Sequence, residues 1–396
     1  MLTMEMIQDA RETLRGVARL TPLSPAPAIG PQICIKSENL QMTGAFKLRG
    51  AYYKVSTLSD EEKAKGVIAC SAGNHAQGIA YSAAKNGVRS IICMPASAPL
   101  SKIEATKGYG AEVVLVDGVY DDAHEKAVSL AEEHGYTFAH PFDDERVIAG
   151  QATIGLEILD QLPEVEQIIV PIGGGGLISG IAFAVKHLKP SCRVVGVQAA
   201  GAPSMYESIR RGQLIELPGV STIADGIAVK RPGDLTFRLC RDYVDEIVTV
   251  TEDEIASAIL TLMETQKTVA EGAGAVSVAA ALFGLVDTSL KTVCLVSGGN
   301  IDVAILSRVI TRGLTKAGRL TKLTTKVTDK PGQLASLLLL IAKTGANIVS
   351  IDHRREDKKT EVNSCVVSMV LETRNAAHVD EVYRALDRAH YTVLDQ

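Results

Sequence analysis

The stretch S-E-N-L-Q-M-T-G-A-F-K-L-R-G, residues 37–50, joins two kinds of structure. An extended run, residues 33–37, leads into it, and a helical pattern, residues 46–54, begins near its end. Its single lysine, Lys47, stands between a phenylalanine and a leucine. Apolar neighbours desolvate an ammonium group, which lowers its pKa and frees the neutral amine to act as a nucleophile or a Schiff-base partner. A surface lysine whose stem lies along apolar neighbours fits the same sequence, so the rest of the chain has to decide.

Short Val- and Ile-rich runs alternate with longer helical patterns from residue 67 onward. The runs are residues 67–70, 90–93, 113–116, 168–172, 194–197, 247–250 and 293–296, and the short run Tyr136-Thr137-Phe138 lies between the third and the fourth. Buried parallel strands joined by crossover helices have this pattern. The sequence therefore predicts an α/β fold with open, mostly parallel sheets. Ligands of such sheets bind beyond the carboxyl ends of the strands.

The composition favours a small-molecule partner. A chain of 396 residues suggests roughly two or three domains, and an apolar fraction of 46% supplies their cores. The net charge of -5 and the pI near 6.0 give no basic footprint for nucleic acid or an anionic membrane. The longest apolar stretch, residues 273–286, is too short to span a bilayer, and residues 4–17 do not resemble a signal peptide. We expect a cytoplasmic protein without a nucleic-acid or membrane partner.

The seven cysteines indicate neither disulfides nor a metal centre. They are scattered, odd in number and contain no Cys-x-x-Cys pair, which is typical of reduced, buried thiols in a cytosolic protein. His124 and Glu125 lack the H-E-x-x-H spacing, and no other His or Cys cluster has ligand spacing. We therefore predict no metal site from these residues.

Three of the predicted strands are followed by glycine-rich or polar motifs. These are Ser71-Ala72-Gly73-Asn74-His75, Gly173-Gly174-Gly175-Gly176-Leu177 and Ser297-Gly298-Gly299-Asn300. Glycine weakens helices and strands, so four in a row before a helix favour a loop whose N–H groups converge on an anion. A flexible turn is the alternative. The G-x-G-x-x-G and G-K-[ST] signatures are both absent, so the cradle suits a single phosphate.

The other two motifs are ambiguous when taken singly. Asn74 could cap the following helix, which is the commoner role of Asn at such a turn. Ser297 could belong to a plain turn, and it lies outside any G-x-S-x-G motif. Combined with a phosphate cradle and a desolvated lysine, however, these residues describe a pocket for pyridoxal phosphate, which needs an amine, a phosphate nest and polar groups for its ring.

The last segment, residues 320–396, changes pattern. Asp329-Lys330-Pro331-Gly332 opens a helix that ends at Gly345-Ala346-Asn347. Strands are expected at residues 323–327, 348–354 and 362–371, with a charged turn at residues 356–359, a helix at residues 378–388 and a short strand at residues 391–394. This βαββαβ order predicts a ferredoxin-like domain. We expect it to be joined to the preceding domain at residues 316–319.

The motifs, in this order, resemble the pyridoxal-phosphate enzymes of the tryptophan-synthase-β fold type (fold type II), and within them the threonine dehydratases, over residues 5–315. Residues 320–396 are similar to an ACT regulatory domain. The resemblance implies a large cofactor-binding domain of residues 1–41 and 143–316, a small catalytic domain of residues 42–142 and an ACT domain of residues 320–396.

The resemblance also implies a role for each motif. Lys47 would carry the cofactor as a Schiff base and, once released, take the α-proton of the substrate, while Phe46 would pack on the cofactor ring. The phosphate would be held by the backbone N–H groups of Gly173, Gly174, Gly175, Gly176 and Leu177. Asn74 would bond the ring 3-hydroxyl oxygen and Ser297 would face the pyridine nitrogen. The substrate would meet Ser71, Asn74, His75 and Glu271, the first three at its carboxylate.

Ser297 bears on the type of reaction that the resemblance implies. A neutral hydroxyl does not favour a protonated pyridine nitrogen, so elimination is favoured over transamination. The implied reaction converts L-threonine to 2-oxobutanoate and ammonia, with L-serine to pyruvate as a side activity. Two alternatives stay open: a dehydratase or racemase for serine or another 3-hydroxy amino acid, and a catalytically inactive regulator that binds amino acids.

Two departures from related enzymes limit the resemblance. Serine racemases of this fold carry a second serine before Gly-Asn-His, where this chain has Ala72, so racemisation should be poor. The carboxylates that hold their divalent metal correspond here to Gln198 and Ser204. The resemblance therefore argues against a tight magnesium site and leaves room for a monovalent cation.

The ACT-like segment implies regulation. We expect an amino-acid effector, with isoleucine as the first candidate, near Asp329, Gly332 and Asn347. An exposed face of this segment predicts pairing with another subunit, as a homodimer or a homotetramer.

Overall fold

The computed structural model describes residues 1–355 and 361–394. The chain forms two compact units, Met1–Asp302 and Val303–Gln396. The charged turn expected at residues 356–359 lies outside the described residues. Within the described part of the chain, none of the helices combines the length and the apolar character that a membrane crossing needs.

The larger sheet of the first unit has six strands in the order β1-β2-β10-β7-β8-β9. Their bounds are β1 Leu23–Pro25, β2 Ile33–Ser37, β10 Thr292–Val296, β7 Gln167–Pro171, β8 Arg193–Ala199 and β9 Glu246–Val250. All neighbours are parallel except β1, which is antiparallel to β2. The predicted α/β fold with mostly parallel sheets is thereby confirmed.

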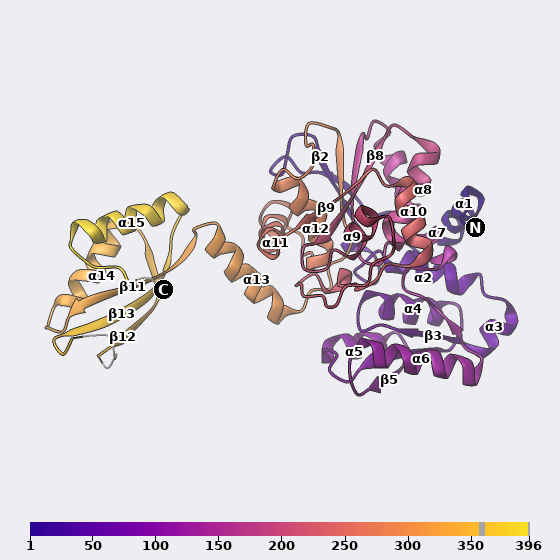
Figure 1. Cartoon of the computed structure of the whole chain (residues 1–396), viewed down its shortest axis with the longest axis horizontal. Coiled ribbons are helices and arrows are strands. Elements are labelled where there is room, and N and C mark those ends of the chain that lie inside the picture. Colours follow the sequence, from indigo (N-terminus) through magenta and orange to yellow (C-terminus); the bar gives the residue numbers. More distant parts are fainter. Residues whose placement is uncertain (356–360, 395–396) are drawn as a thin grey trace. The chain divides into compact units, whose positions relative to one another are not determined.

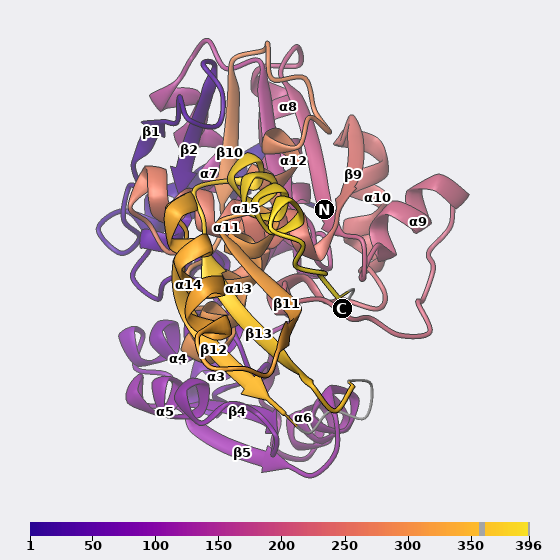
Figure 2. The same ribbon diagram turned by 90° about the vertical axis from the view of Figure 1, so that its left-hand side faces the viewer.

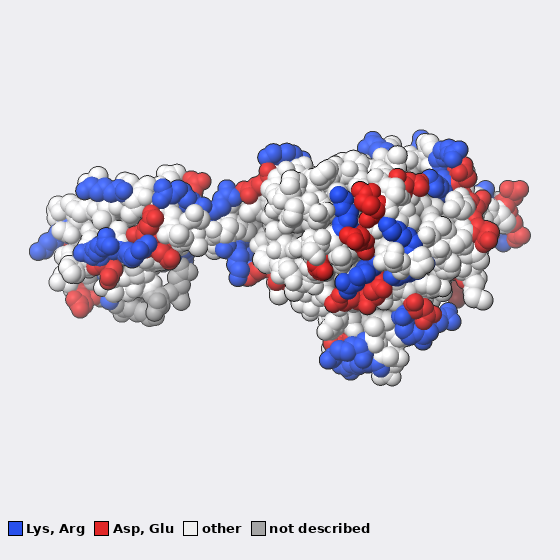
Figure 3. Space-filling model, turned by 90° about the horizontal axis from the view of Figure 1, so that it is seen from above, with Lys and Arg blue, Asp and Glu red and all other residues white. Residues whose placement is uncertain are grey.

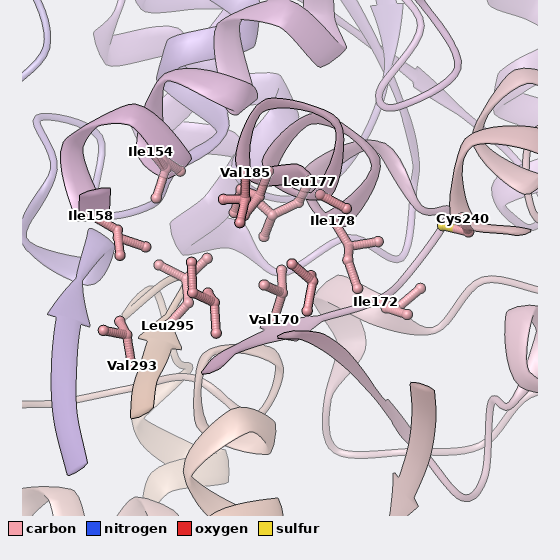
Figure 4. Packing of buried hydrophobic residues seen from close by; sticks show 14 of the residues in the cluster. Ile154, Ile158, Val170, Ile172, Leu177, Ile178, Val185, Cys240, Val293 and Leu295 are labelled. Atoms are coloured by element: carbon pink, nitrogen blue, oxygen red, sulfur yellow. The ribbon is translucent and has the colours of Figure 1, made fainter. Parts of the chain in front are cut away.

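Helices cover both faces of this sheet, which explains the continuous apolar strands. One face carries α7 (Glu145–Gln161), α8 (Gly176–Leu188) and α10 (Asp234–Tyr243), and the other carries α12 (Gly272–Leu282) with α11 (Glu252–Gln266) packed on it (Figure 1). Figure 4 shows Ile158 of α7 and Val185 of α8 above Val170 of β7 and Leu295 of β10. Helices α1 (Met4–Leu14) and α9 (Ser204–Arg211) and the short η2 (Asp225–Ile227) complete this half.

The smaller sheet has four parallel strands in the order β5-β4-β3-β6. Their bounds are β3 Val67–Cys70, β4 Ser90–Pro95, β5 Glu112–Val116 and β6 Thr137–Phe138. Successive residues of β3 alternate between two cores. Val67 and Ala69 face α2 (Lys47–Ser56), α4 (Asn74–Lys85) and α5 (Leu100–Gly108), whereas Ile68 and Cys70 face α6 (Tyr120–His134). We call residues 67–138 the four-stranded half; α3 (Asp60–Lys65) leads into it.

Glycines seat α2 between the two halves. A Cβ on Gly150 of α7 would lie 2.6 Å from the carbonyl oxygen of Arg49, and one on Gly78 of α4 would lie 3.3 Å from that of Lys47. A Cβ on Gly180 of α8 would collide with the backbone of α7 at Ile148. The helices that surround Lys47 therefore approach one another backbone to backbone.

A buried network of four charges fixes the same helix. Arg49 donates to Glu38 of η1 (Glu38–Leu40) from Nε and Nη2, at 2.8 Å each, and to Glu157 of α7 from Nη1 at 2.6 Å. Lys36 of β2 donates to Glu157 at 2.6 Å, and Thr21 Oγ1 donates to Glu38. Two cations face two anions, so the buried charge is balanced. The pKa of Glu38 stays below its usual value because Arg49 and its hydrogen bonds outweigh the desolvation of the carboxylate.

The second unit is a three-stranded antiparallel sheet with helices on one face (Figure 2). Its elements are α13 (Val303–Lys316), β11 (Leu320–Thr328), α14 (Gln333–Thr344), β12 (Asn347–Arg354), β13 (Ser364–Glu372) and α15 (Ala376–Arg388), and the sheet order is β11-β13-β12. The short strand expected at residues 391–394 is a single bridge between Thr325 and Val393. Tyr391 still donates its N–H to Leu386 at the end of α15, which leaves too few extended residues for a strand.

All seven cysteines are free thiols and six of them are buried, as the sequence predicted. On the face drawn in Figure 3, lysine and arginine side chains are interspersed with aspartate and glutamate.

The buried network makes a testable prediction. Arg49→Met removes the charge that balances Glu38 and Glu157, so it should lower the free energy of unfolding by about 3–5 kcal/mol. Urea denaturation of the cofactor-free protein measures this. Arg193→Met is the control, because the pair of Arg193 with Glu246 is exposed and should contribute less than about 1 kcal/mol. Equal losses in the two variants would contradict the structural role of the network.

Candidate active site

Lys47 is the first residue of α2, and its amine lies at the interior edge between the two sheets. Its Nζ donates to the carbonyl oxygen of Pro141 at 2.7 Å and lies 5.2 Å from the centroid of the Phe46 ring. Desolvation lowers the pKa of Lys47 to about 8, although the negative charge of Glu271 opposes this shift. Lys47 is therefore not a solvated surface lysine, and an appreciable fraction of its amine is neutral near physiological pH.

Backbone pairing brings Lys47 to the end of β10. Ala45 and Gly298 form an antiparallel bridge, and Phe46 donates its N–H to Ser297 O at 3.0 Å. The Ser297 side chain is buried, and its Oγ lies 3.4 Å from Ala273 O. The structure thus brings together Phe46, Lys47 and Ser297, which are some 250 residues apart in the sequence.

The four glycines follow β7 and lead into α8, as expected for an anion cradle. Gly175 has φ +100, a conformation that residues with a Cβ rarely adopt. A Cβ on Gly176 would lie 2.7 Å from Phe142 O, and one on Gly174 would collide with the Phe142 ring. Only glycine fits these positions. The first-turn N–H groups of α8, from Gly176 and Leu177 onward, have no acceptor within the helix and can bind an anion.

Residues outside the cradle hold its shape. Thr236 Oγ1 donates to Gly174 O at 2.6 Å, and Asp143 accepts the backbone N–H groups of Leu235 and Thr236 at 3.0 Å each. Gly173 packs on η2, where a Cβ would lie 3.1 Å from Ile227 Cα. With a lysine amine nearby and room for glycine alone, the residues present fit the phosphate and aldehyde ends of pyridoxal phosphate.

Asn74 connects the two halves. It is the first residue of α4, with Gly73 as the N-cap and no capping hydrogen bond from a side chain, so the capping interpretation is wrong. Its Nδ2 instead donates to Glu271 Oε1 at 2.7 Å, and its Oδ1 accepts from Asn300 Nδ2 at 2.8 Å. Asn300 Nδ2 also donates to Thr43 O at 2.8 Å. The Asn74 amide is thereby held in one orientation.

Glu271 is a buried carboxyl at the start of α12, with 5% of its surface exposed. Desolvation is the main cause that raises its pKa, to about 7, and the charge of Asp225 adds to this. The hydrogen bond from Asn74 and the charge of Lys102 act in the opposite direction. Glu271 can therefore change its protonation state near neutral pH.

Ser71 and His75 also lie at this strand end, but their side chains already have partners. Ser71 Oγ accepts from Gly73 N at 3.1 Å. The His75 ring donates from Nε2 to Ala139 O at 2.8 Å, and burial lowers its pKa to about 3, so the ring is neutral. Its Nδ1 is buried without a hydrogen-bond partner among the described residues and can only accept. A carboxylate would therefore meet the N–H groups that begin α4, not the His75 ring.

At the position of the racemases' metal ligands, Gln198 is satisfied by the protein. Its Oε1 accepts from Tyr206 N at 2.8 Å and its Nε2 lies 3.4 Å from Ile172 O. The hydroxyl of Ser204 is buried, and within residues 1–355 and 361–394 it meets no hydrogen-bond partner. The monovalent cation stays a prediction.

The three residues expected near an effector lie apart in the second unit. Asp329 and Gly332 follow the carboxyl end of β11, whereas Asn347 begins β12, and β11 and β12 run in the same direction. Asp329 and Asn347 therefore lie at opposite ends of the sheet, so a single ligand cannot contact both residues within one copy of the second unit. Asp329, His353 and Cys365 do lie close together, but Asp329 pairs with Arg355 and the Cys365 thiol donates to Val327 O.

Sequence reasoning gave no role to several residues that shape the site. Asn300 was part of a quoted motif, but its link to Asn74 depends on a contact across 226 positions. No local sequence pattern marks Pro141 and Phe142. Pro141 contributes the carbonyl that accepts from Lys47, and Phe142 packs against the glycine cradle, and both follow from where the chain leaves β6. His140 accepts from Asp143 N at 2.8 Å, and burial lowers its pKa to about 4, so it adds no positive charge beside Lys47.

Glu271 yields a prediction on pH dependence. A carboxyl with a pKa near 7 in the folded protein and 4.5 when unfolded makes stability fall as pH rises between these values. Glu271→Gln keeps an acceptor for Asn74 and removes the cost of ionising a buried carboxyl. Above pH 7, the free energy of unfolding of the cofactor-free variant should therefore be higher than that of the native protein, by up to about 3 kcal/mol. Urea denaturation at a series of pH values measures the difference. The exposed Glu246→Gln is the control, and parallel pH profiles for Glu271→Gln and the native chain would refute the assignment.

Comparisons with known proteins agree with this geometry. Residues 14–298 match the family model described as pyridoxal-phosphate dependent enzyme. A relative named L-threonine ammonia-lyase, from Thermotoga maritima, is 49% identical over 397 residues, which cover 99% of both chains. Among solved structures, the processed form of threonine deaminase isoform 2 from Solanum lycopersicum matches with TM-score 0.74 and 37% identity, over 78% of this chain and 87% of that one. Maize serine racemase matches with TM-score 0.74 and 35% identity, over 80% of this chain and 98% of that one.

The family model covers most of the chain, and its cofactor is the one that Lys47 and the glycine cradle fit. The chain therefore belongs to the family of pyridoxal-phosphate dependent enzymes.

Proposed function

We propose that this protein is a lyase that dehydrates and deaminates L-threonine to 2-oxobutanoate and ammonia. The observation that carries the proposal is the desolvated amine of Lys47 between the glycine cradle and Ser297. A relative named for this activity matches over 99% of both chains, so the likeness extends through the second unit as well.

When bound, pyridoxal phosphate supplies an electron sink for the electrons that remain on the substrate's α-carbon after its proton has left. Lys47 supplies the base: its pKa of about 8 leaves a neutral amine that can take that proton. The N–H groups at the start of α4, where Asn74 and His75 stand, orient the substrate carboxylate with the Ser71 turn. Glu271, beside Asn74, is placed to exchange a proton as the β-hydroxyl leaves as water.

The remaining cofactor contacts are part of the proposal. Phe46 would pack beside the ring, Asn74 would bond the ring hydroxyl and Ser297 would face the ring nitrogen with a neutral hydroxyl. The cradle of Gly173, Gly174, Gly175, Gly176 and Leu177 would hold the phosphate. Water lost in the elimination is returned when the released product is hydrolysed, so the balance is threonine to 2-oxobutanoate and ammonia.

A serine-directed lyase or racemase is the second candidate, and the match to maize serine racemase is the observation that favours it. Ala72 argues against racemisation, because a methyl group cannot supply a proton on the face opposite Lys47. Turnover of L-threonine, L-serine and D-serine by one preparation separates the two. We expect L-threonine to be preferred and D-serine to be neither formed nor consumed appreciably.

The catalytic prediction concerns Lys47. The protein with pyridoxal phosphate should show a visible absorbance and form 2-oxobutanoate from L-threonine, and Lys47→Ala should lose the absorbance and at least about a thousandfold in kcat. The exposed Lys65→Ala serves as the control. The proposed function fails if the native protein with cofactor forms no 2-oxo acid from threonine.

Regulation, assembly and location complete the proposal. We propose that residues 320–396 of the second unit form an ACT domain that binds an amino acid, with isoleucine as the first candidate, and that the protein is a cytoplasmic homodimer or homotetramer. Because Asp329 and Gly332 lie at the opposite end of the sheet from Asn347, a ligand that touches both groups needs a second copy of the domain. We also keep the domain limits at residues 1–41 with 143–316, 42–142 and 320–396.

The effector prediction follows from this arrangement. Isoleucine should change the threonine saturation curve of the full-length protein, and Asp329→Asn should weaken that response at least about tenfold without changing activity in its absence. Asp352→Asn, an exposed acid on β12, is the matched control. If neither isoleucine nor valine alters the saturation curve or the melting temperature, the choice of effector is wrong.

A further inference from the structure

Around the site, four polar contacts among the described residues join the four-stranded half, residues 67–138, to the part of the first unit that contains the six-stranded sheet. Two are the amide contacts of Asn74 with Glu271 and Asn300. The other two are ion pairs: Lys102 Nζ lies 2.6 Å from Asp225 Oδ2, and Lys230 Nζ lies 3.1 Å from Asp121 Oδ2. The ion pairs have no part in the chemistry proposed above, and they differ in their surroundings.

The pair of Lys102 and Asp225 is the more enclosed of the two. The exposed fractions of the side chains are 18% for Lys102 and 53% for Asp225, against 45% for Lys230 and 64% for Asp121, so the difference lies mainly in the lysines. Both oxygens of Asp225 are engaged, since Oδ1 also accepts from Gly226 N at 2.9 Å. A partly buried pair with fixed geometry contributes more than an exposed one, so these two pairs should not be equivalent.

Asp225 belongs to η2, which touches two parts of the site. On one side, a Cβ added to Gly173 of the phosphate cradle would lie 3.1 Å from Ile227 Cα. On the other, a Cβ added to Gly226 would lie 3.1 Å from Ala273 Cβ and 3.5 Å from Glu271 Oε1. Asp225 therefore belongs to a segment, η2, that packs against both the cradle and Glu271, so a displacement of Asp225 would be felt at both.

Lys102 belongs to α5, which packs against α4. Helix α4 begins with Asn74, whose amide donates to Glu271. The ion pair links α5 to η2 and the amide contact links α4 to the start of α12, and α4 packs on α5 as α12 packs on η2. If α5 moved away from η2, α4 would be free to move with it, and the Asn74 amide would leave Glu271.

We propose that Lys102 and Asp225 are positioning residues, whose ion pair holds the four-stranded half against η2 and so keeps Asn74 against Glu271. The proposal rests on the cofactor contact proposed for Asn74, and it does not depend on which hydroxy amino acid is the substrate. Two charged residues that take no part in the chemistry would thereby influence the protonation of the Glu271 carboxyl.

The charges around Glu271 also act on its pKa directly. Asp225 raises the pKa of Glu271 and Lys102 lowers it, and Lys47 of α2 interacts with it as well. Asn74 and the backbone of Asn300 contribute hydrogen bonds that lower it. Loss of the Asp225 charge should therefore lower the pKa of Glu271 directly, and loss of the Lys102 charge should raise it. Release of Asn74 should add an upward shift in both variants, because each breaks the same ion pair, and the same substitutions in an Asn74→Ala background isolate the direct effect of the charges.

The experiment compares Asp225→Asn, Lys102→Gln and the charge-keeping Lys102→Arg with Lys230→Gln and Asp121→Asn, which break the exposed pair. The visible absorbance of each protein with bound pyridoxal phosphate is titrated with pH in the absence of substrate. We expect the midpoint that Glu271→Gln abolishes to lie higher in Asp225→Asn and in Lys102→Gln, by roughly half a unit each, than the shifts caused by the same substitutions in the Asn74→Ala background predict. Lys102→Arg and the two controls should keep the native midpoint.

A second measurement does not need the cofactor. In the cofactor-free proteins, the fall in unfolding free energy from pH 5 to pH 8 should be larger after each substitution than the direct charge effect, measured in the Asn74→Ala background, accounts for. Equal shifts with and without the Asn74 side chain, or equal shifts in the Lys230 and Asp121 controls, would overturn the proposal. Absence of threonine turnover in the native protein would reject the proposed function alone, because neither titration uses substrate.

Discussion

The buried pairing of Arg49 with Glu38 and Glu157 is the constraint on which the site depends. Arg49 stands two residues after Lys47, Glu38 directly follows β2 and Glu157 belongs to α7, so one guanidinium fixes the lysine-bearing helix to both neighbours. Its planar fork holds Glu38 through two N–H groups and Glu157 through a third, a bidentate geometry that the ammonium group of a lysine cannot reproduce. Because the network is neutral as a whole, it adds no net charge near an amine that must stay partly deprotonated.

Burial shifts the pKa values of all the titratable groups of the site toward their neutral forms. It brings the pKa of Lys47 down to about 8 and that of Glu271 up to about 7, while His75 and His140, with pKa values of about 3 and 4, stay uncharged. The backbone N–H groups at the start of α8 and α4 can then attract the phosphate and the substrate carboxylate without competition from charged imidazoles. Proton transfer is left to the two groups whose pKa values lie closest to 7.

Much of the fold could be predicted from the sequence because helices cover both faces of the parallel sheets, which makes strands such as β7 and β10 continuously apolar. The glycine cradle was also predictable, since glycine weakens strands and helices and four in a row between the two favour an anion-binding loop. The use of the Asn74 side chain could not be decided in the same way: local statistics favour a cap, and only the contact with Glu271 excludes it. Nor did the sequence reveal the final bridge at Val393, where the end of α15 uses residues that a strand would need.

The charge network and the relation of Asp329 to Asn347 escaped prediction for a different reason. Lys36, Glu38 and Arg49 look like ordinary polar residues within a motif, and their burial follows from the meeting of η1, α2 and α7. Asp329 and Asn347 flank the same helix in sequence, yet that helix returns the chain to the other end of the sheet before β12 begins. Both depend on the direction in which elements run, which local sequence does not encode.

The glycine contacts between helices have a consequence for how such a site can change. Helix α8 begins at the cradle, Gly180 sets its distance to α7, and Gly150 sets the distance from α7 to α2, where the lysine stands. The packing of three helix backbones therefore fixes the distance between the phosphate-binding loop and the lysine amine, and this distance limits the length of the cofactor that fits. Side chains on the substrate side can be exchanged without altering that distance, so new substrate preferences can arise on this scaffold while the same cofactor is retained.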